Sequence, residues 1–146
     1  MTDLDRFVKA QETTYLKALS EIKNGKKQSH FMWYIFPQIR GLGMSEMSRY
    51  YGISCPLEAN DYLNHEILGS RLREITSELL KLNEDNPESI FGLVDAMKLK
   101  SCMTLFDYVS SFDIFKDVLD KFYGGKVDEK TIFLCNKSKS LIYKKQ

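Results

Sequence analysis

Apolar residues recur every three or four positions along most of the chain, which is the period of a helix with one buried face. The clearest example is residues 67–82, where Leu72, Ile75 and Leu79 share a stripe and charged residues fill the opposite face. The same spacing is found in further segments, namely residues 4–8, 15–22, 45–51, 57–63, 99–106, 112–122 and 128–135. No series of alternating segments would build a sheet. The pattern therefore predicts one compact, mainly α domain of seven or eight helices.

Several residues mark where these helices begin and end. Ser45 is expected to cap one helix, and His65 to stand at the start of the next long one. Asn86 with Pro87 predicts a single turn closed by Gly92, and Asp95 is expected to cap the long helix that follows. We expect the domain to span residues 1–136, with residues 137–146 as a basic, flexible tail.

Residues 29–47, SHFMWYIFPQIRGLGMSEM, form the segment around which the rest of the chain is expected to fold. The six consecutive apolar residues at 31–36 are too many for one face of an exposed element, so this segment must be enclosed. Six residues fit a buried helix or a buried strand, and we favour a short helix. Pro37 ends regular structure, and Gly41 and Gly43 allow a close approach or positive φ. An aromatic centre beside a polar, glycine-bearing rim is typical of a small-molecule pocket.

Composition narrows the possible partners. The chain has 146 residues and a formal charge of +1, which gives no general reason for binding nucleic acid or an anionic membrane. No segment reaches the roughly 20 apolar residues of a membrane span, and Asp3 and Asp5 are incompatible with a signal peptide. Three widely spaced cysteines and two histidines lack metal-ligand spacing, so we expect reduced thiols, no metal, no cofactor and a cytoplasmic protein.

The segment following the aromatic run offers an anion site. Gly43 lies just before Ser45 and a helix start, where free backbone N–H groups and the helix dipole favour an anion, and Arg40 is close in sequence. Gly41 and Gly43 would then contact the anion through their backbone. The simpler interpretation is a tight turn, because no strand precedes the two glycines as a phosphate-binding loop requires.

Three residues in the aromatic segment have both a structural and a functional interpretation. Trp33 is either a core residue or a stacking platform for a flat ring. His30 is either a satisfied structural group or a proton donor at the lip of the pocket. Gln38, between Pro37 and Ile39, has no evident local role and is expected to hydrogen-bond a ligand or a neighbouring loop.

The start of the long helix is a second polar region. In the simpler interpretation, Asp95 caps the helix, Lys98 and Ser101 lie on a solvated face, and no ligand is involved. The alternative is that this carboxylate, ammonium and hydroxyl bind a phosphate or a ribose. We expect the aromatic segment, Gln38, Arg40 and residues 95–101 to form one cleft.

Four blocks in a fixed order carry a resemblance to a known family: SHFMWYIFPQIRGLGMSEMSRYYGI, NHEILGSRLREI, DAMKLKSCMTLF and FKDVLDKFYGG. They resemble an uncharacterised bacterial and plant family that is classed as a domain of unknown function and sometimes labelled calpastatin. We expect that family to belong to the YbiA-like superfamily, which contains the NADAR proteins. This resemblance implies a mainly helical fold and an N-glycosidase acting on ribosylated bases or ADP-ribose-like molecules.

Under that resemblance the candidate residues take catalytic and binding roles. An N-glycosidase needs a carboxylate near its oxocarbenium-like transition state and a group that assists the departing base. Asp95 or Glu46 would supply the carboxylate, and His30 or Gln38 would assist the base. Trp33 would stack on a ribosylated or nucleotide-like ligand, with nucleic acid expected only as a modified substrate. The alternatives are a nucleotide- or peptide-binding module without turnover, and a protein that acts through its basic tail.

Overall fold

The computed structural model describes residues 3–145, with side chains as far as residue 138. The described residues form nine helices and no strand, which confirms a mainly α, compact single domain. The helices are α1 (Asp5–Glu12), α2 (Tyr15–Lys23), α3 (Met32–Ile35), α4 (Glu46–Tyr50), α5 (Pro56–Asn64), α6 (Glu66–Lys81), α7 (Pro87–Val109), α8 (Ile114–Tyr123) and α9 (Glu129–Lys145).

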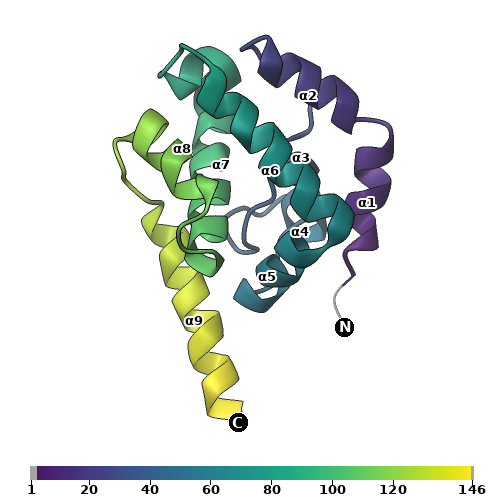
Figure 1. Ribbon diagram of the computed structural model, residues 1–146. Coiled ribbons are helices and arrows are strands. Elements are labelled where there is room, and N and C mark those ends of the chain that lie inside the picture. Colours follow the sequence, from purple (N-terminus) through teal and green to yellow (C-terminus); the bar gives the residue numbers. More distant parts are fainter. Residues whose placement is uncertain (1–2, 146) are drawn as a thin grey trace.

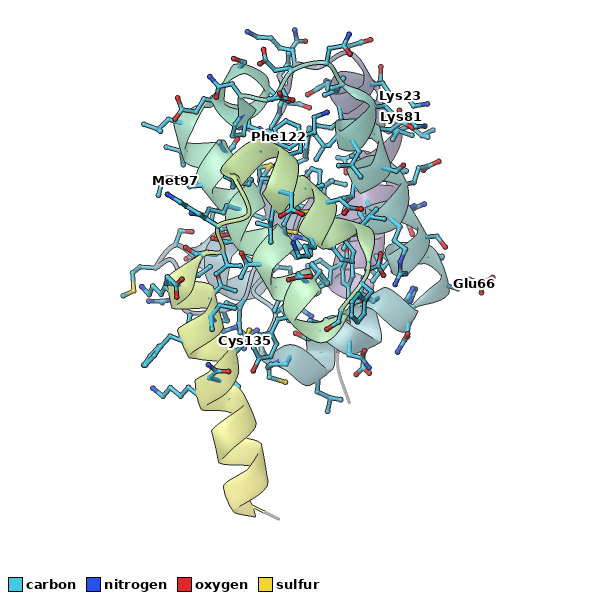
Figure 2. All side chains as sticks on the ribbon, turned by 60° about the vertical axis from the view of Figure 1, so that its left-hand side comes forward. Lys23, Glu66, Lys81, Met97, Phe122 and Cys135 are labelled. Carbon is cyan, nitrogen blue, oxygen red and sulfur yellow. The ribbon has the colours of Figure 1, made fainter. Side chains whose placement is uncertain are left out.

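Helix α7 is the centre of the molecule. It packs against α3, α5, α8 and α9, while α6 packs against α1, α2, α5 and α8 (Figure 1). Leu99, Met103 and Phe106 of α7 have no exposed surface, at the i, i+4 and i+7 spacing predicted from the sequence. Figure 2 shows side chains filling the space between α7 and α8, and Cys135 where α9 leaves the body of the molecule.

Side-chain caps fix several helix starts. Ser45 Oγ accepts a hydrogen bond from Ser48 N at 3.1 Å, and His65 Nδ1 accepts from the backbone at the start of α6, as expected for both residues. Gly92, at φ 80°, interrupts α7 after its first turn, which confirms the predicted break. The prediction that Asp95 caps the helix is wrong, because the helical conformation resumes directly after Gly92 and Asp95 lies within it.

The central aromatic segment contains the short helix α3, as predicted. Pro37 follows it, and the chain then pairs with residue 53: Ile53 N donates to Gln38 O at 2.9 Å, and Arg40 N donates to Ile53 O at 2.7 Å. Phe31, Ile35 and Phe36 are buried, with 0–2% of each residue exposed. This pairing fixes the backbone from the Gln38 carbonyl to the Arg40 amide, directly after the Gln38 side chain.

Helix α9 extends from the body of the molecule and remains helical to Lys145 (Figure 1). Thr131 and Cys135 are buried on the part of α9 that packs against α7 and α5. The predicted domain boundary at residue 136 and the flexible tail stay predictions, and Gln146 lies outside the described residues. Within residues 3–145 no helix is long and apolar enough to cross a membrane.

Candidate functional site

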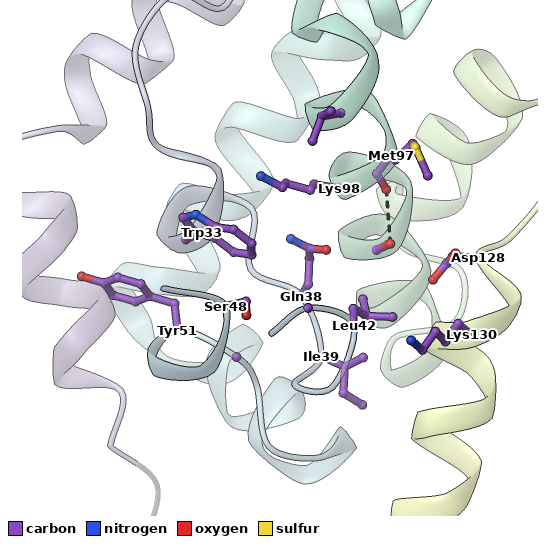
Figure 3. Close-up of a pocket in the computed structure, with 14 residues that line it drawn as sticks. Trp33, Gln38, Ile39, Leu42, Ser48, Tyr51, Met97, Lys98, Asp128 and Lys130 are labelled. Atoms are coloured by element: carbon purple, nitrogen blue, oxygen red, sulfur yellow. Dashed lines mark hydrogen bonds between the residues drawn. The ribbon is translucent and has the colours of Figure 1, made fainter. Parts of the chain in front are cut away.

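A cavity of about 320 Å³ opens between α3, the loop before α4, the connection from α4 to α5, the middle turns of α7 and the start of α9 (Figure 3). Its volume lies at the lower end of the roughly 300–1,000 Å³ that is usual for small-molecule sites. The lining residues are Trp33, Gln38, Ile39, Leu42, Gly43, Ser48, Tyr51, Gly52, Val94, Met97, Lys98, Ser101, Asp128 and Lys130. We call this cavity the Trp33 pocket.

The Gln38 amide projects into the Trp33 pocket between Trp33 and α7 (Figure 3). Only 8% of this residue is exposed, and its Nε2 is buried without a hydrogen-bond partner among the described residues. Buried polar groups are nearly always hydrogen-bonded, because losing contact with water without compensation is costly. The wall of the Trp33 pocket thus contains an amide whose N–H donor has no partner among the described residues.

Lys98 reaches from α7 across the pocket to the indole ring. Its Nζ lies 4.2 Å from the centroid of the Trp33 ring and 3.3 Å from Asp95 Oδ1. The second carboxylate oxygen, Asp95 Oδ2, lies 2.8 Å from Lys27 Nζ. Asp95 is therefore held by two lysines, and of these three charged residues Lys98 lines the pocket.

Hydroxyl groups line other parts of the wall. Ser48 Oγ donates to Ser45 O at 2.8 Å and Ser101 Oγ donates to Met97 O at 3.2 Å, so each oxygen keeps lone pairs that can accept a hydrogen bond. Burial, followed by the neighbouring Tyr50 and Tyr34, raises the pKa of Tyr51 above its ordinary value. Its hydroxyl therefore stays neutral at physiological pH.

The rim at α9 carries one charge of each sign. Asp128 directly precedes α9, and its Oδ2 accepts a hydrogen bond from Thr131 N at 3.0 Å. Lys130, two residues further and exposed, also lines the pocket. Asp128 thus has a structural role as a helix cap, and Lys130 is free to approach a ligand.

Gly52 separates the Trp33 pocket from Arg40. A Cβ atom at this position would lie 2.7 Å from Ser48 O and 2.8 Å from Arg40 Cβ, so the close approach requires glycine. The Arg40 guanidinium donates to Arg49 O at 3.2 Å and to Gly52 O at 3.1 Å. The expectation that Arg40 joins Gln38 in one cleft is not met, because its side chain is directed to the other side of this backbone.

Arg40 and Glu46 both line a second, more open cavity of about 980 Å³. The other residues that line it are Asp3, Arg6, Met47, Arg49, Tyr50, Tyr51, Ser54 and Glu58. Arg6 and Glu58 form a buried ion pair here, with Arg6 Nη2 3.3 Å from Glu58 Oε1. Tyr51 lines both cavities. The two predicted phosphate-binding cations, Arg40 and Lys98, consequently belong to different cavities.

Of the eleven residues singled out in the sequence, five line the Trp33 pocket: Trp33, Gln38, Gly43, Lys98 and Ser101. Asp95 contacts Lys98 from outside the lining. His30 is exposed and lines neither cavity, and its carbonyl accepts a hydrogen bond from Tyr34 Oη at 3.1 Å. Gly41 is exposed and lines neither cavity, and Ser45 is a helix cap. The candidate catalytic residues Asp95, Glu46 and His30 are therefore not brought together.

Some lining residues were missed by the sequence analysis. Val94 and Met97 share a helical face with Lys98 and Ser101, so the i, i+3, i+4 and i+7 spacing around Lys98 could have identified them. Asp128 carried no such signal, because only the folded chain brings α9 beside α7.

These features define an all-α, single-domain protein with a small, mainly apolar pocket beside its central helix. Residues 1–135 match the family described as "Protein of unknown function (DUF1810)", and the chain belongs to that family. The structure is similar to the crystal structure of the conserved hypothetical protein Rv1873 from Mycobacterium tuberculosis, with 43% sequence identity and a TM-score of 0.90. That alignment covers 92% of this chain and 96% of the other. A comparison with curated proteins gives no match.

The family match corrects one expectation from the sequence. Membership of the YbiA-like superfamily, with its NADAR proteins, is wrong, because DUF1810 is a different family and no comparison connects the two. Residue roles that followed only from that resemblance lose their basis. The mainly helical fold remains, because the structure supports it independently.

Proposed function

We propose that this domain binds a small planar molecule in the Trp33 pocket and recognises its polar edge through Gln38. The observation that carries the proposal is the Gln38 amide: Gln38 lines the cavity, and its buried Nε2 lacks a partner among the described residues. A ligand carbonyl or ring nitrogen at this point would complete the hydrogen bonding that the fold leaves unmet.

The shape of the pocket supports a small molecule rather than a peptide. Its volume of about 320 Å³ suits one ring system with a short substituent. Its wall combines an indole, the apolar side chains of Ile39 and Leu42, and a few polar groups, which is the usual composition of a small-ligand site. Hydrogen bonds from a buried amide would then set the orientation of the ring.

Binding without turnover is the function that the site supports best. The candidate carboxylates are unsuitable for catalysis in this pocket, since Asp95 is paired with two lysines and Glu46 lines the second cavity. N-glycosidase activity stays a prediction, and no contact in the Trp33 pocket favours it. A cytoplasmic location also stays a prediction, to which the free thiols of Cys55, Cys102 and Cys135 lend support.

The test is a thermal-shift and calorimetry screen with nucleobases, nucleosides, nucleotides, ADP-ribose and ribose 5-phosphate. A ligand of the native state raises the free energy of unfolding by RT ln(1 + [L]/Kd), so a ligand at about 100 Kd adds about 2.7 kcal/mol. We expect at least one compound to stabilise the wild type, and the Gln38→Met variant to lose that effect. Absence of any stabilisation at millimolar ligand, or equal stabilisation of both proteins, would contradict the proposal. Chromatography of the same mixtures for a released base reports turnover.

A further inference from the structure

The face of the Trp33 ring in the pocket is already covered by an ammonium group. Lys98 Nζ lies 4.2 Å from the ring centroid, within the roughly 6 Å of a cation–π contact (Figure 3). A flat ligand cannot stack on that face while the ammonium stays there. If stacking on this face contributes to binding, Lys98 has to move when the ligand enters.

The charges around Asp95 identify which of its partners can move. Lys27 Nζ is 2.8 Å from Asp95 Oδ2, its side chain is only 7% exposed, and it also lies over the Phe31 ring at 4.9 Å. Lys98 Nζ is 3.3 Å from Asp95 Oδ1, and 23% of its side chain is exposed. Because the Lys27 pair is shorter and more deeply buried, Lys27 can hold Asp95 in place while Lys98 leaves.

The same cluster carries an excess positive charge. Two ammonium groups share one carboxylate, and partial burial weakens the screening that water would provide. At the rim, Lys130 adds a positive charge, and the capping Asp128 opposes it. Lys98 is the residue of this cluster that can change its partner. An anionic group on the ligand would replace Asp95 in the ion pair with Lys98.

We propose, on the basis of the proposed function, that the ligand is an aromatic ring bearing an anionic group such as a phosphate. Lys98 swings from the Trp33 face to the anion, and the ring takes its place on the indole. A neutral ring would displace the ammonium without offering it a partner, and a free anion would leave the indole face uncovered. The ring and the anion therefore have to be parts of the same molecule for tight binding.

Trp33 is the sole tryptophan of the chain, so its fluorescence reports directly on this step. The probes are the four common nucleoside monophosphates, their nucleosides, and inorganic phosphate, each titrated by fluorescence and calorimetry. We expect at least one monophosphate to bind the wild type tenfold or more tightly than its nucleoside and to change the Trp33 emission. Inorganic phosphate alone is expected to bind at least tenfold more weakly than that monophosphate.

Lys98→Met is expected to abolish the difference between monophosphate and nucleoside, because the uncovered indole accepts either ring and the anion has lost its partner. Lys98→Gln serves as a second variant if Lys98→Met does not fold, as judged by circular dichroism. The matched control is Lys100→Met, since Lys100 also lies on α7 over an aromatic ring, Tyr123 at 5.9 Å, and does not line the pocket. This control should keep the wild-type preference.

The outcomes separate this inference from the proposed function. If a probe binds and Gln38→Met abolishes its binding, but the preference for the monophosphate is absent or survives in Lys98→Met, the role of Lys98 is refuted and the proposed function stands. If inorganic phosphate binds as tightly as the monophosphate, the ring contributes nothing and the inference is again refuted. If no monophosphate binds, this inference is refuted, and the proposed function fails only if no compound of the wider screen binds.

Discussion

Gln38 allows a test in which lost function and gained stability should appear together. Its Nε2 is buried without a partner among the described residues, and a buried polar group left unpaired costs roughly 1–3 kcal/mol. Gln38→Met keeps the length of the side chain and removes the amide. We therefore expect the ligand-free variant to be more stable than the wild type by about 1–2 kcal/mol, which is about 3–6 °C in Tm for a domain of this size.

The matched control is Gln11, a second buried glutamine with 2% of the residue exposed. Its Nε2 donates to Tyr34 O at 2.7 Å and to Tyr62 Oη at 3.0 Å, and its Oε1 accepts from Arg71 Nη1 at 3.4 Å. Gln11→Met removes these bonds and leaves buried partners unpaired. The same substitution is expected to cost about 2–4 kcal/mol there, opposite in sign to its effect at Gln38.

Urea unfolding followed by circular dichroism measures the free energy of unfolding of both variants and the wild type. The slope of this free energy against urea concentration should be the same for all three proteins. The ligand found in the binding screen is then added to each protein. It should stabilise the wild type and leave Gln38→Met unchanged. A loss of 1 kcal/mol or more in ligand-free Gln38→Met would mean that the amide is satisfied in the folded protein, and the argument for a ligand at this atom would fail.

Two further predictions concern the frame of the pocket. Gly52→Ala places a Cβ 2.7 Å from Ser48 O, so we expect a loss of about 2–3 kcal/mol in urea unfolding, and a change within 0.5 kcal/mol would contradict the proposed close approach. The pKa of Glu21 is lowered from its ordinary value of 4.5. Burial alone would raise this pKa, but hydrogen bonds from the Ser29 hydroxyl and from the Gln28 and Ser29 backbone lower it by more. The pKa of Glu21 is lower in the folded state than in the unfolded state, so ionised Glu21 stabilises the fold above pH 4.5. This stabilisation is lost as the pH falls through the folded-state pKa. The deficit of Glu21→Gln, about 1–2 kcal/mol at pH 7, should therefore close below pH 4.5, and a constant deficit in unfolding titrations would refute the assignment.

Local signals in the sequence were sufficient for most of the fold. Ser45 and His65 cap helices, Gly92 breaks α7, and the spacing of Leu72, Ile75 and Leu79 marks the buried face of α6. Each of these is decided by neighbours within a few residues, which is the range over which capping and periodicity act. The prediction that a helix starts at Asp95 was wrong, because the break in the helix lies at Gly92, three residues earlier.

The candidate site was only partly predictable, since its geometry depends on contacts between distant segments. Gln38 and Lys98 come from α3 and α7 regions that pack together. Gln38 was identified because a polar residue beside an aromatic run is noticeable, and Lys98 because it lies near the expected start of the long helix. Arg40 lies two residues from Gln38 and was expected to share the cleft with it. The pairing with Ile53 and the close approach at Gly52 direct it into the second cavity, and no local pattern encodes that direction.

The frame around the pocket supports the idea that Lys98 is its moving part. Glu21 Oε1 accepts hydrogen bonds from Gln28 N at 2.6 Å and Ser29 N at 2.9 Å, and Lys27 N donates to Ile90 O at 2.8 Å. These bonds tie the segment that leads into α3 to both α2 and α7. Trp33 is therefore carried on a backbone anchored from two sides. With the walls fixed in this way, little conformational entropy is lost when a ring binds, and selectivity depends on whether the ligand offers Lys98 a better partner than Asp95.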